Sequence, residues 1–109
     1  MSSKTILHPP EAPLPKTFTR IMGRYPDYAA AVEQLGKVVR DAGPIDEKTA
    51  QLIQLAAAAS IRSEGALHSH VRRARQAGAT TEEIQHTLIL LTSTIGLPAV
   101  MAALSWMEE

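Results

Sequence analysis

Apolar residues recur at helical spacing along most of the chain, in stretches that glycine and proline interrupt. The clearest stretch covers residues 27–41, where apolar side chains recur every three or four residues before Gly43 and Pro44 end the pattern. No stretch alternates with a period of two for long enough to indicate a strand. The sequence therefore predicts an all-α fold, a compact bundle of about six helices in one domain at residues 15–109. The other expected helices cover residues 15–24, 46–61, 62–77, 80–92 and 96–107.

Two of the expected helices begin with clear capping signals. Asp46 is a good N-cap, and Thr80 with Glu83 forms the spacing of a capping box. The helix that follows Asp46 is apolar nearly all round in its second half and is rich in alanine. Small side chains let neighbouring helices approach closely, so we expect this helix to lie in the middle of the bundle.

The first 14 residues differ in composition from the rest of the chain. Pro9, Pro10 and Pro13 occur there with little periodic apolar pattern, which predicts an extended proline-rich arm at residues 1–14. The same stretch lacks the basic and apolar regions of a secretory signal. A cytoplasmic location is therefore expected.

A long uncharged stretch runs from Thr87 to Met107 and is about as long as a membrane span. Polar residues, Gly96 and Pro98 interrupt its middle, and acidic residues flank it, so two buried helices and no membrane partner are predicted. These two helices carry more apolar surface than one small core can bury. We therefore expect the chain to form a homo-oligomer.

Charge and cysteine content exclude several classes of function. Eleven basic and eleven acidic side chains give a formal net charge of zero, and aromatic residues are few, which argues against nucleic-acid binding. The chain has no cysteine, so thiolate nucleophiles, thiol redox chemistry and cysteine-bound metals are excluded.

The segment from Arg62 to Ala77 gathers most of the candidate chemistry. Within it, His70 falls in the middle of an apolar arc that includes Leu67 and Val71, so its side chain is expected to point inward. Such a histidine is either a core residue satisfied by one hydrogen bond or a general acid/base. Two amides on an otherwise apolar helix could lie near it, either as buried hydrogen-bonding groups or as a substrate-binding wall: Gln51 and Gln54.

Glu64 and His68 lie four residues apart on one face of the same helix, either as a surface pair or as support for the imidazole of His70. His68 and His70 are about 200° apart around a helix, so they cannot converge on one ion. A metal site would need Glu82 or His86 from the next helix, or a partner chain, and no metal ligands are assigned.

Three arginines follow His70 and point in different directions around the helix. Arg72, Arg73 and Arg75 are interpreted first as a solvated face or as partners in salt bridges. Arg72 and Arg75 are also the candidates for binding an anionic substrate.

The order of these features resembles a known family. An alanine-rich helix is followed by Ser-Glu-Gly-Ala-Leu-His-Ser-His-Val-Arg-Arg-Ala, then by Gln-Ala-Gly-Ala-Thr-Thr-Glu-Glu-Ile, then by an apolar helix pair. This order is similar to the carboxymuconolactone decarboxylase family, which includes the alkylhydroperoxidase D-like proteins. The resemblance implies the alkylhydroperoxidase D-like helical fold and assembly as a trimer or hexamer.

The peroxidase branch of that family has a Cys-x-x-Cys-x-x-x-His motif preceded by a glutamate. Aligned on His70, the cysteine positions fall on Ser63 and Ala66, and the glutamate position falls on Gln51. A hydroxyl or a methyl group cannot replace a thiolate in hydroperoxide reduction. The chain is therefore not expected to be a thiol peroxidase.

The decarboxylase branch has a segment similar to Gly-Arg-Glu-x-Glu-Leu-Arg-x-His, which Glu64, Leu67 and His70 match. Ala66 and His68 depart from it, and the arginine lost at position 68 weakens the expectation of that branch's substrate, a dicarboxylated lactone.

Two functions follow as expectations. The first is a cofactor-free lyase or decarboxylase that acts on a small anionic lactone or acid. In it His70 is the general acid/base, supported by Glu64 or His68, and the substrate is bound by Gln51, Gln54, Arg72 and Arg75. The alternative is a catalytically inactive family member that serves as a small helical oligomeric binding or accessory protein.

Overall fold

A computed structural model describes residues 16–108, and the proline-rich arm predicted at residues 1–14 lies outside the described residues. Helices make up nearly all of the described chain, and no strand occurs there. The predicted all-α fold is confirmed, with a single-turn helix, α6, added to the six expected. The helices are α1 (Lys16–Arg24), α2 (Pro26–Asp41), α3 (Glu47–Ser60), α4 (Glu64–Gln76), α5 (Thr81–Ile89), α6 (Thr92–Ile95) and α7 (Leu97–Met107).

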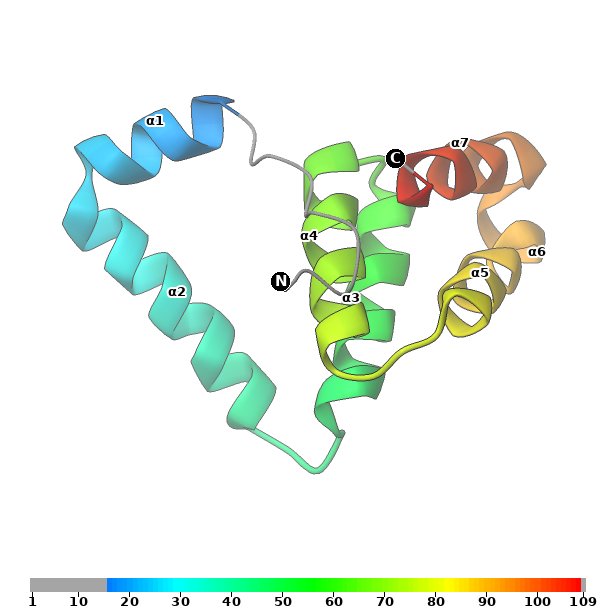
Figure 1. Ribbon diagram of the computed structural model, residues 1–109, viewed down its shortest axis with the longest axis horizontal. Coiled ribbons are helices and arrows are strands. Elements are labelled where there is room, and N and C mark those ends of the chain that lie inside the picture. Colours follow the sequence, from blue (N-terminus) through cyan, green and yellow to red (C-terminus); the bar gives the residue numbers. More distant parts are fainter. Residues whose placement is uncertain (1–15, 109) are drawn as a thin grey trace, which may run out of the picture.

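Helices α3 and α4 form the centre of a bundle that α5 and α7 complete (Figure 1). The two central helices pack side by side along most of their lengths, because Ala58, Ala59 and Ala74 at their contact are small and fully buried. The alanine-rich helix is therefore central, as its sequence predicts. The other residues of the core cluster are Leu55, Leu67, Val71, Ala79, Ile84, Leu88, Ala103 and Met107.

The connection between α3 and α4 shows where the fourth helix begins. Arg62 has a left-handed backbone (φ 57°), and the amide of Ser63 donates to the carbonyl of Ala58 at 2.9 Å. The Ser63 hydroxyl then accepts from the amide of Ala66 at 3.3 Å as the N-cap of α4. The helix predicted from residue 62 therefore begins at Glu64, because Arg62 forms the turn.

The capping box predicted at Thr80 and Glu83 is present, and α5 ends at Ile89 rather than near Thr92. After α6, Gly96 adopts a positive φ of 93°, and Pro98 falls in the first turn of α7. The uncharged stretch is thus divided among three helices. None of the described helices is long and apolar enough to cross a membrane.

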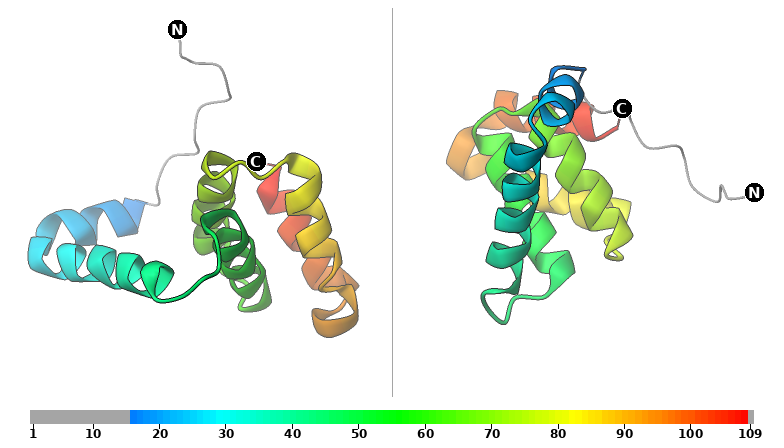
Figure 2. Two further views of the ribbon diagram at one scale, coloured as in Figure 1. Left: turned by 90° about the horizontal axis from the view of Figure 1, so that it is seen from below. Right: turned by 90° about the vertical axis from the view of Figure 1, so that its left-hand side faces the viewer.

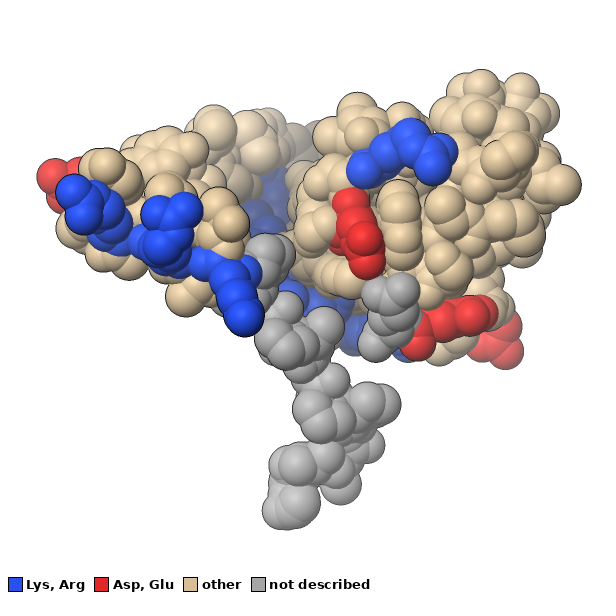
Figure 3. All heavy atoms as spheres, turned by 90° about the horizontal axis from the view of Figure 1, so that it is seen from above, with Lys and Arg blue, Asp and Glu red and all other residues tan. Residues whose placement is uncertain are grey.

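Helices α1 and α2 form an arm that projects from the bundle, as the two views in Figure 2 also show. We call residues 16–41 the α1–α2 arm. Its two helices pack against each other, neither packs along a bundle helix, and no residue in either is buried. Helix α1 carries Lys16, Arg20 and Arg24 at a spacing of four residues, which places them on one face of the helix. Figure 3 shows Lys and Arg side chains gathered along the arm.

Candidate functional site

A groove separates the α1–α2 arm from α4. Its volume is about 950 Å³, and it is bounded by both helices of the arm, the start of α3 and the second half of α4. Four of the lining residues are charged: Glu33 and Arg40 from α2, Glu47 from α3 and Arg73 from α4. The remaining lining residues are Phe18, Met22, Ala29, Ala30, Val32, Gly36, Gln76 and Ala77.

A chain of hydrogen bonds leads from the groove wall to His70. Nε2 of Gln51 donates to the Glu47 carboxylate at 2.8 Å, and Oε1 of Gln51 lies 2.8 Å from Nδ1 of His70. Glu47 and Gln51 are one turn apart on α3, whereas His70 comes from α4. Gln51 is fully buried, and it is the only buried polar side chain among the described residues. The structure thus brings together two residues singled out in the sequence, His70 and Gln51.

This arrangement fixes which nitrogen of His70 carries the proton. An ionised carboxylate can only accept hydrogen bonds, so the amide nitrogen of Gln51 must face Glu47 and its oxygen must face His70. The Gln51 oxygen is also only an acceptor, and Nδ1 of the neutral imidazole must therefore be the protonated nitrogen. Nε2 is left with its lone pair, which can accept a proton.

The surroundings of His70 keep the imidazole neutral. Burial lowers the pKa of His70 below its ordinary value of 6.5, and the positive charges of Arg73 and Arg40 lower this pKa further. At neutral pH the side chain is therefore an uncharged base. An imidazole in this state suits general base catalysis.

His70 lies beside the part of α4 that borders the groove, although it is not itself one of the lining residues. Arg73 and Ala77 line the groove, and they lie about 60° and about 20° from His70 around the helix. At the same end, Nε of Arg40 lies 3.7 Å from the Glu47 carboxylate. The groove beside His70 is thus lined by two guanidinium groups, which can bind a small anion, and by the carboxylates of Glu33 and Glu47.

Three residues of this site were missed in the sequence. Glu47 could have been found, because it precedes Gln51 by four residues and so shares its helix face. Arg73 follows His70 by three residues, but it was grouped with its neighbours as a solvated residue. No sequence signal indicates Arg40, which reaches the site from the end of α2 across the loop to α3.

Glu64 and His68 form a pair away from His70. Nε2 of His68 lies 3.1 Å from the backbone carbonyl of Trp106 and 3.8 Å from the Glu64 carboxylate. Both of these oxygens are acceptors, so this nitrogen carries the proton and donates. The contact joins α4 to the end of α7 and directs Nε2 of His68 toward Trp106. Support of His70 by Glu64 or His68 stays a prediction.

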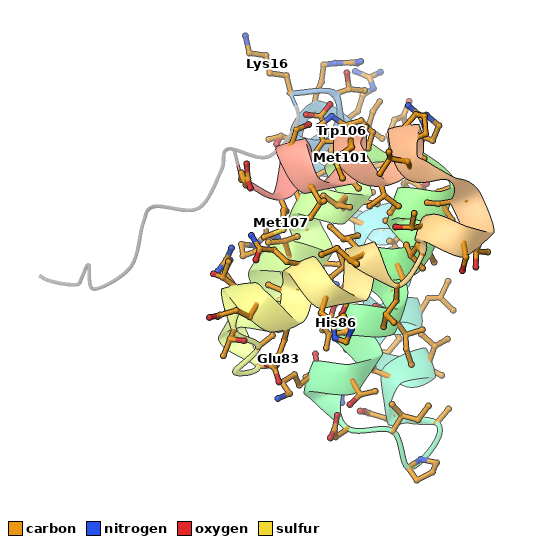
Figure 4. The ribbon with its side chains drawn as sticks, turned by 90° about the vertical axis from the view of Figure 1, so that its right-hand side faces the viewer. Lys16, Glu83, His86, Met101, Trp106 and Met107 are labelled. Carbon is orange, nitrogen blue, oxygen red and sulfur yellow. The ribbon has the colours of Figure 1, made fainter. Side chains whose placement is uncertain are left out.

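No group of three or more histidine, aspartate or glutamate side chains in residues 16–108 is placed to hold a metal ion. His86 lies on the side of α5 away from α7 and Trp106, as Figure 4 shows. It is therefore far from His68, whose Nε2 contacts Trp106.

The remaining predicted binding residues lie apart from His70. Gln54 lines a smaller hollow of about 340 Å³ between α3 and the loop that ends α2. Arg75 donates to the Thr81 hydroxyl at 2.8 Å and so joins α4 to the start of α5. Arg72 lies about 160° around α4 from His70. Arg73, rather than Arg72 or Arg75, is the arginine of α4 that lines the groove.

Comparison with known proteins agrees with this fold. The sequence pattern described as the carboxymuconolactone decarboxylase family matches residues 26–109. Two uncharacterized proteins of Methanocaldococcus jannaschii are also similar. One is 32% identical over 84 residues, which cover 77% of this chain and 78% of that protein. The other is 31% identical over 87 residues, which cover 79% of this chain and 84% of that protein. The chain belongs to the carboxymuconolactone decarboxylase family.

Proposed function

We propose that the chain binds a small carboxylated lactone or acid at the His70 end of the groove and transfers one proton there without a cofactor. His70 is the general acid/base in this proposal. Arg40 and Arg73 attract the carboxylate of the bound molecule, and Gln51 holds the imidazole in the required orientation.

The observation that carries the proposal is the hydrogen-bond chain from Glu47 through Gln51 to His70. A histidine that only filled space in the core would need one partner and no defined tautomer. Here the partner is itself oriented by a carboxylate, so the lone pair of Nε2 is fixed before anything binds. Such preorganisation favours proton transfer, because no reorganisation is needed during the reaction.

The proton balance of a decarboxylation is compatible with one imidazole. Loss of carbon dioxide breaks a C–C bond and leaves its electron pair on the remaining lactone, which then needs one proton. Nε2 of the neutral His70 imidazole first takes up one proton from solvent, and the imidazolium then passes this proton to the carbanion, which returns the imidazole to its neutral state. The Gln51 oxygen accepts from Nδ1–H in both states, so the ring keeps its orientation.

The alternative is a family member that binds a small anion without turning it over. It is favoured by the contacts of His68, whose Nε2 lies near the Trp106 carbonyl and the Glu64 carboxylate and so joins α4 to α7. Under this alternative the groove is a binding site only.

The test compares the wild type with His70→Asn on a panel of carboxylated lactones and related acids. The asparagine amide can donate to Gln51 as Nδ1–H does, but it has no basic nitrogen. Turnover should fall by about 100-fold or more, while binding by calorimetry and thermal stability change little. Arg73→Gln should instead weaken binding. Binding without turnover by the wild type would establish the alternative, and absence of both would refute the proposal.

A further inference from the structure

One face of helix α2 presents both a carboxylate and a guanidinium group to the groove. Glu33, Gly36 and Arg40 line the groove and lie within about 60° of one another around the helix. Gly36 and Arg40 are half-buried there, whereas most of α2 is exposed. Two opposite charges therefore belong to one wall of the groove, on either side of a glycine.

Gly36 leaves room for the side chain of Arg40. Glycine is unfavourable inside a helix, so its place in the middle of α2 needs a reason. A Cβ atom at Gly36 would lie 3.2 Å from Nη1 of Arg40, closer than ordinary van der Waals contact. Long side chains of a helix point back toward its N-terminus, so the Arg40 guanidinium lies over Gly36, on the side of Glu33. A larger residue at position 36 would displace this guanidinium.

The two charges on this wall are not joined to each other. Within residues 16–108, the Glu33 carboxylate makes no hydrogen bond or ion pair with another side chain. In the same residues Arg40 forms one ion pair, with Glu47, and the distance of 3.7 Å is long. Glu33 and the guanidinium over Gly36 are thus about one turn apart, and both border the groove. Each can bind a ligand group of the opposite charge.

We infer that the groove selects a ligand that carries a protonated amino group beside a carboxylate, as an α-amino acid does. Glu33 binds the ammonium group, and Arg40 and Arg73 bind the carboxylate. The two charged groups of such a ligand are attached to one carbon atom, so the ligand fits between Glu33 and the guanidinium over Gly36. This inference rests on the proposed function, because it narrows the carboxylated ligand proposed there to one that also has an amino group.

The charges of the groove lining favour such a ligand over a simple anion. The two guanidinium groups of the lining are balanced by the carboxylates of Glu33 and Glu47. A simple carboxylate bound to Arg40 would lie near the Glu33 carboxylate, and repulsion between like charges would weaken its binding. An ammonium group on the same ligand replaces this repulsion by attraction, so Glu33 acts as a specificity-determining residue.

The remainder of the lining can accept an apolar side chain of the ligand. Phe18 and Met22 of α1 and Val32 of α2 border the same groove. Phe18 is 45% exposed and Val32 is 40% exposed, so an apolar substituent would remove their surface from water. Amino acids with apolar side chains, such as leucine, are therefore the expected ligand class.

The first experiment measures binding of L-leucine and of isocaproate to the full chain by isothermal titration calorimetry. The two probes share a carbon skeleton, and only leucine has the amino group. Leucine should bind to the wild type about 10-fold more tightly, because it makes one more charge-assisted hydrogen bond. Glu33→Gln should abolish this preference by weakening the binding of leucine alone. Glu82→Gln, on α5 and outside the groove lining, is the matched control and should retain the preference.

Three results would overturn the inference: equal affinities of the two probes for the wild type, binding of neither probe, or an equal loss for both probes in Glu33→Gln. The measurement does not depend on turnover. Binding of both probes without a preference would leave the proposed function standing, whereas a preference for leucine without turnover of any acid would leave this inference standing. The two failures are therefore distinguishable.

The second experiment tests whether Gly36 positions the guanidinium of Arg40. Gly36→Leu should weaken the binding of both probes by about 10-fold, because the leucine side chain would displace the group that binds their carboxylates. Helix content by circular dichroism should not fall, since leucine is favourable in a helix. Gly23→Leu is the matched control, because a Cβ atom at Gly23 meets no atom within 4 Å. Unchanged affinities in Gly36→Leu would overturn the inference.

Discussion

The α1–α2 arm and the α3–α7 bundle are built from similar amphipathic helices but differ in what they bury. The bundle encloses a cluster in which Leu55, Leu67, Ile84 and Leu88 are fully buried, whereas no residue of α1 or α2 is buried. The spacing of apolar residues therefore predicts that a helix has an apolar face, but it does not predict whether a neighbour from the same chain covers that face. The site at His70 lies where the two regions meet.

The largest expected difference between the regions is in the response to truncation of leucine. Leu67→Ala should lower the free energy of unfolding by about 3–5 kcal/mol, because it leaves a cavity between α3 and α4. Leu35→Ala should cost below about 0.5 kcal/mol in dilute solution, since its side chain is mostly exposed. Urea titrations at several protein concentrations would measure both values. A cost for Leu35→Ala that rises with concentration would indicate that the arm is stabilised by assembly, whereas equal costs in dilute solution would contradict the comparison.

A smaller effect is expected at the junction of the two regions. Gln51→Leu removes the acceptor of Nδ1–H of His70 and should cost about 1–3 kcal/mol, because a buried donor is left without its partner. The matched change Gln54→Leu should cost less, since Gln54 is partly exposed and makes no side-chain hydrogen bond to the described residues. Thermal unfolding of both variants measures these costs. A larger loss of stability for Gln54→Leu than for Gln51→Leu would contradict the prediction.

Replacing a threonine by alanine should lower the free energy of unfolding by about 1 kcal/mol more at a helix cap of the bundle than within the arm. Thr80→Ala breaks the capping box of α5 and should destabilise the chain by about 0.5–2 kcal/mol. Thr17→Ala in α1 removes no cap and substitutes a better helix former, so its effect should be near zero or slightly stabilising. Chemical denaturation of the pair provides the measurement, and a costly Thr17→Ala would reveal a role for α1 that its exposure does not suggest.

The smallest expected effect is a pH dependence of stability. The pKa of His70 is lowered in the folded chain relative to 6.5, so the unfolded chain binds more protons as the pH falls below that value. The neutral His70 side chain therefore makes its full contribution to the free energy of unfolding above pH 6.5. This contribution is lost as the pH falls from 6.5 through the lowered pKa of the folded chain. His70→Asn should remove up to about one proton from the slope of stability against pH, and His86→Asn should retain it. Denaturation midpoints measured between pH 4 and pH 8 give this slope for each variant. A slope of stability against pH that is the same in His70→Asn and in the wild type would contradict the prediction.

Most of the secondary structure could be predicted because its signals are local. Asp46 and the pair Thr80 and Glu83 cap the helices that they were expected to cap, and Gly96 and Pro98 divide the uncharged stretch. The differences occur at helix ends. Arg62 was expected within a helix but forms a turn, because a left-handed residue there lets Ser63 bond back to Ala58.

The candidate site was predicted only in part. His70 and Gln51 were singled out, and the structure joins them at 2.8 Å. Glu64 and His68 share a helix with His70, but the direction of each side chain from the axis separates them from it. Arg40 enters the site from another helix, which a pattern within one helix cannot show, whereas the spacing of four residues between Glu47 and Gln51 could have been recognised in the sequence.

The sequence by itself determined that the chain is helical, where its helices are capped and interrupted, and that thiol chemistry is excluded. Only the tertiary structure decided that Gln51 meets His70 and fixes its tautomer, that Arg40 lies beside Glu47, and that the α1–α2 arm leaves the bundle. The physical reason is the range of the interactions. Capping and backbone propensity act within about one turn of helix, whereas the site depends on contacts between residues far apart in the chain, 19 positions in the case of Gln51 and His70.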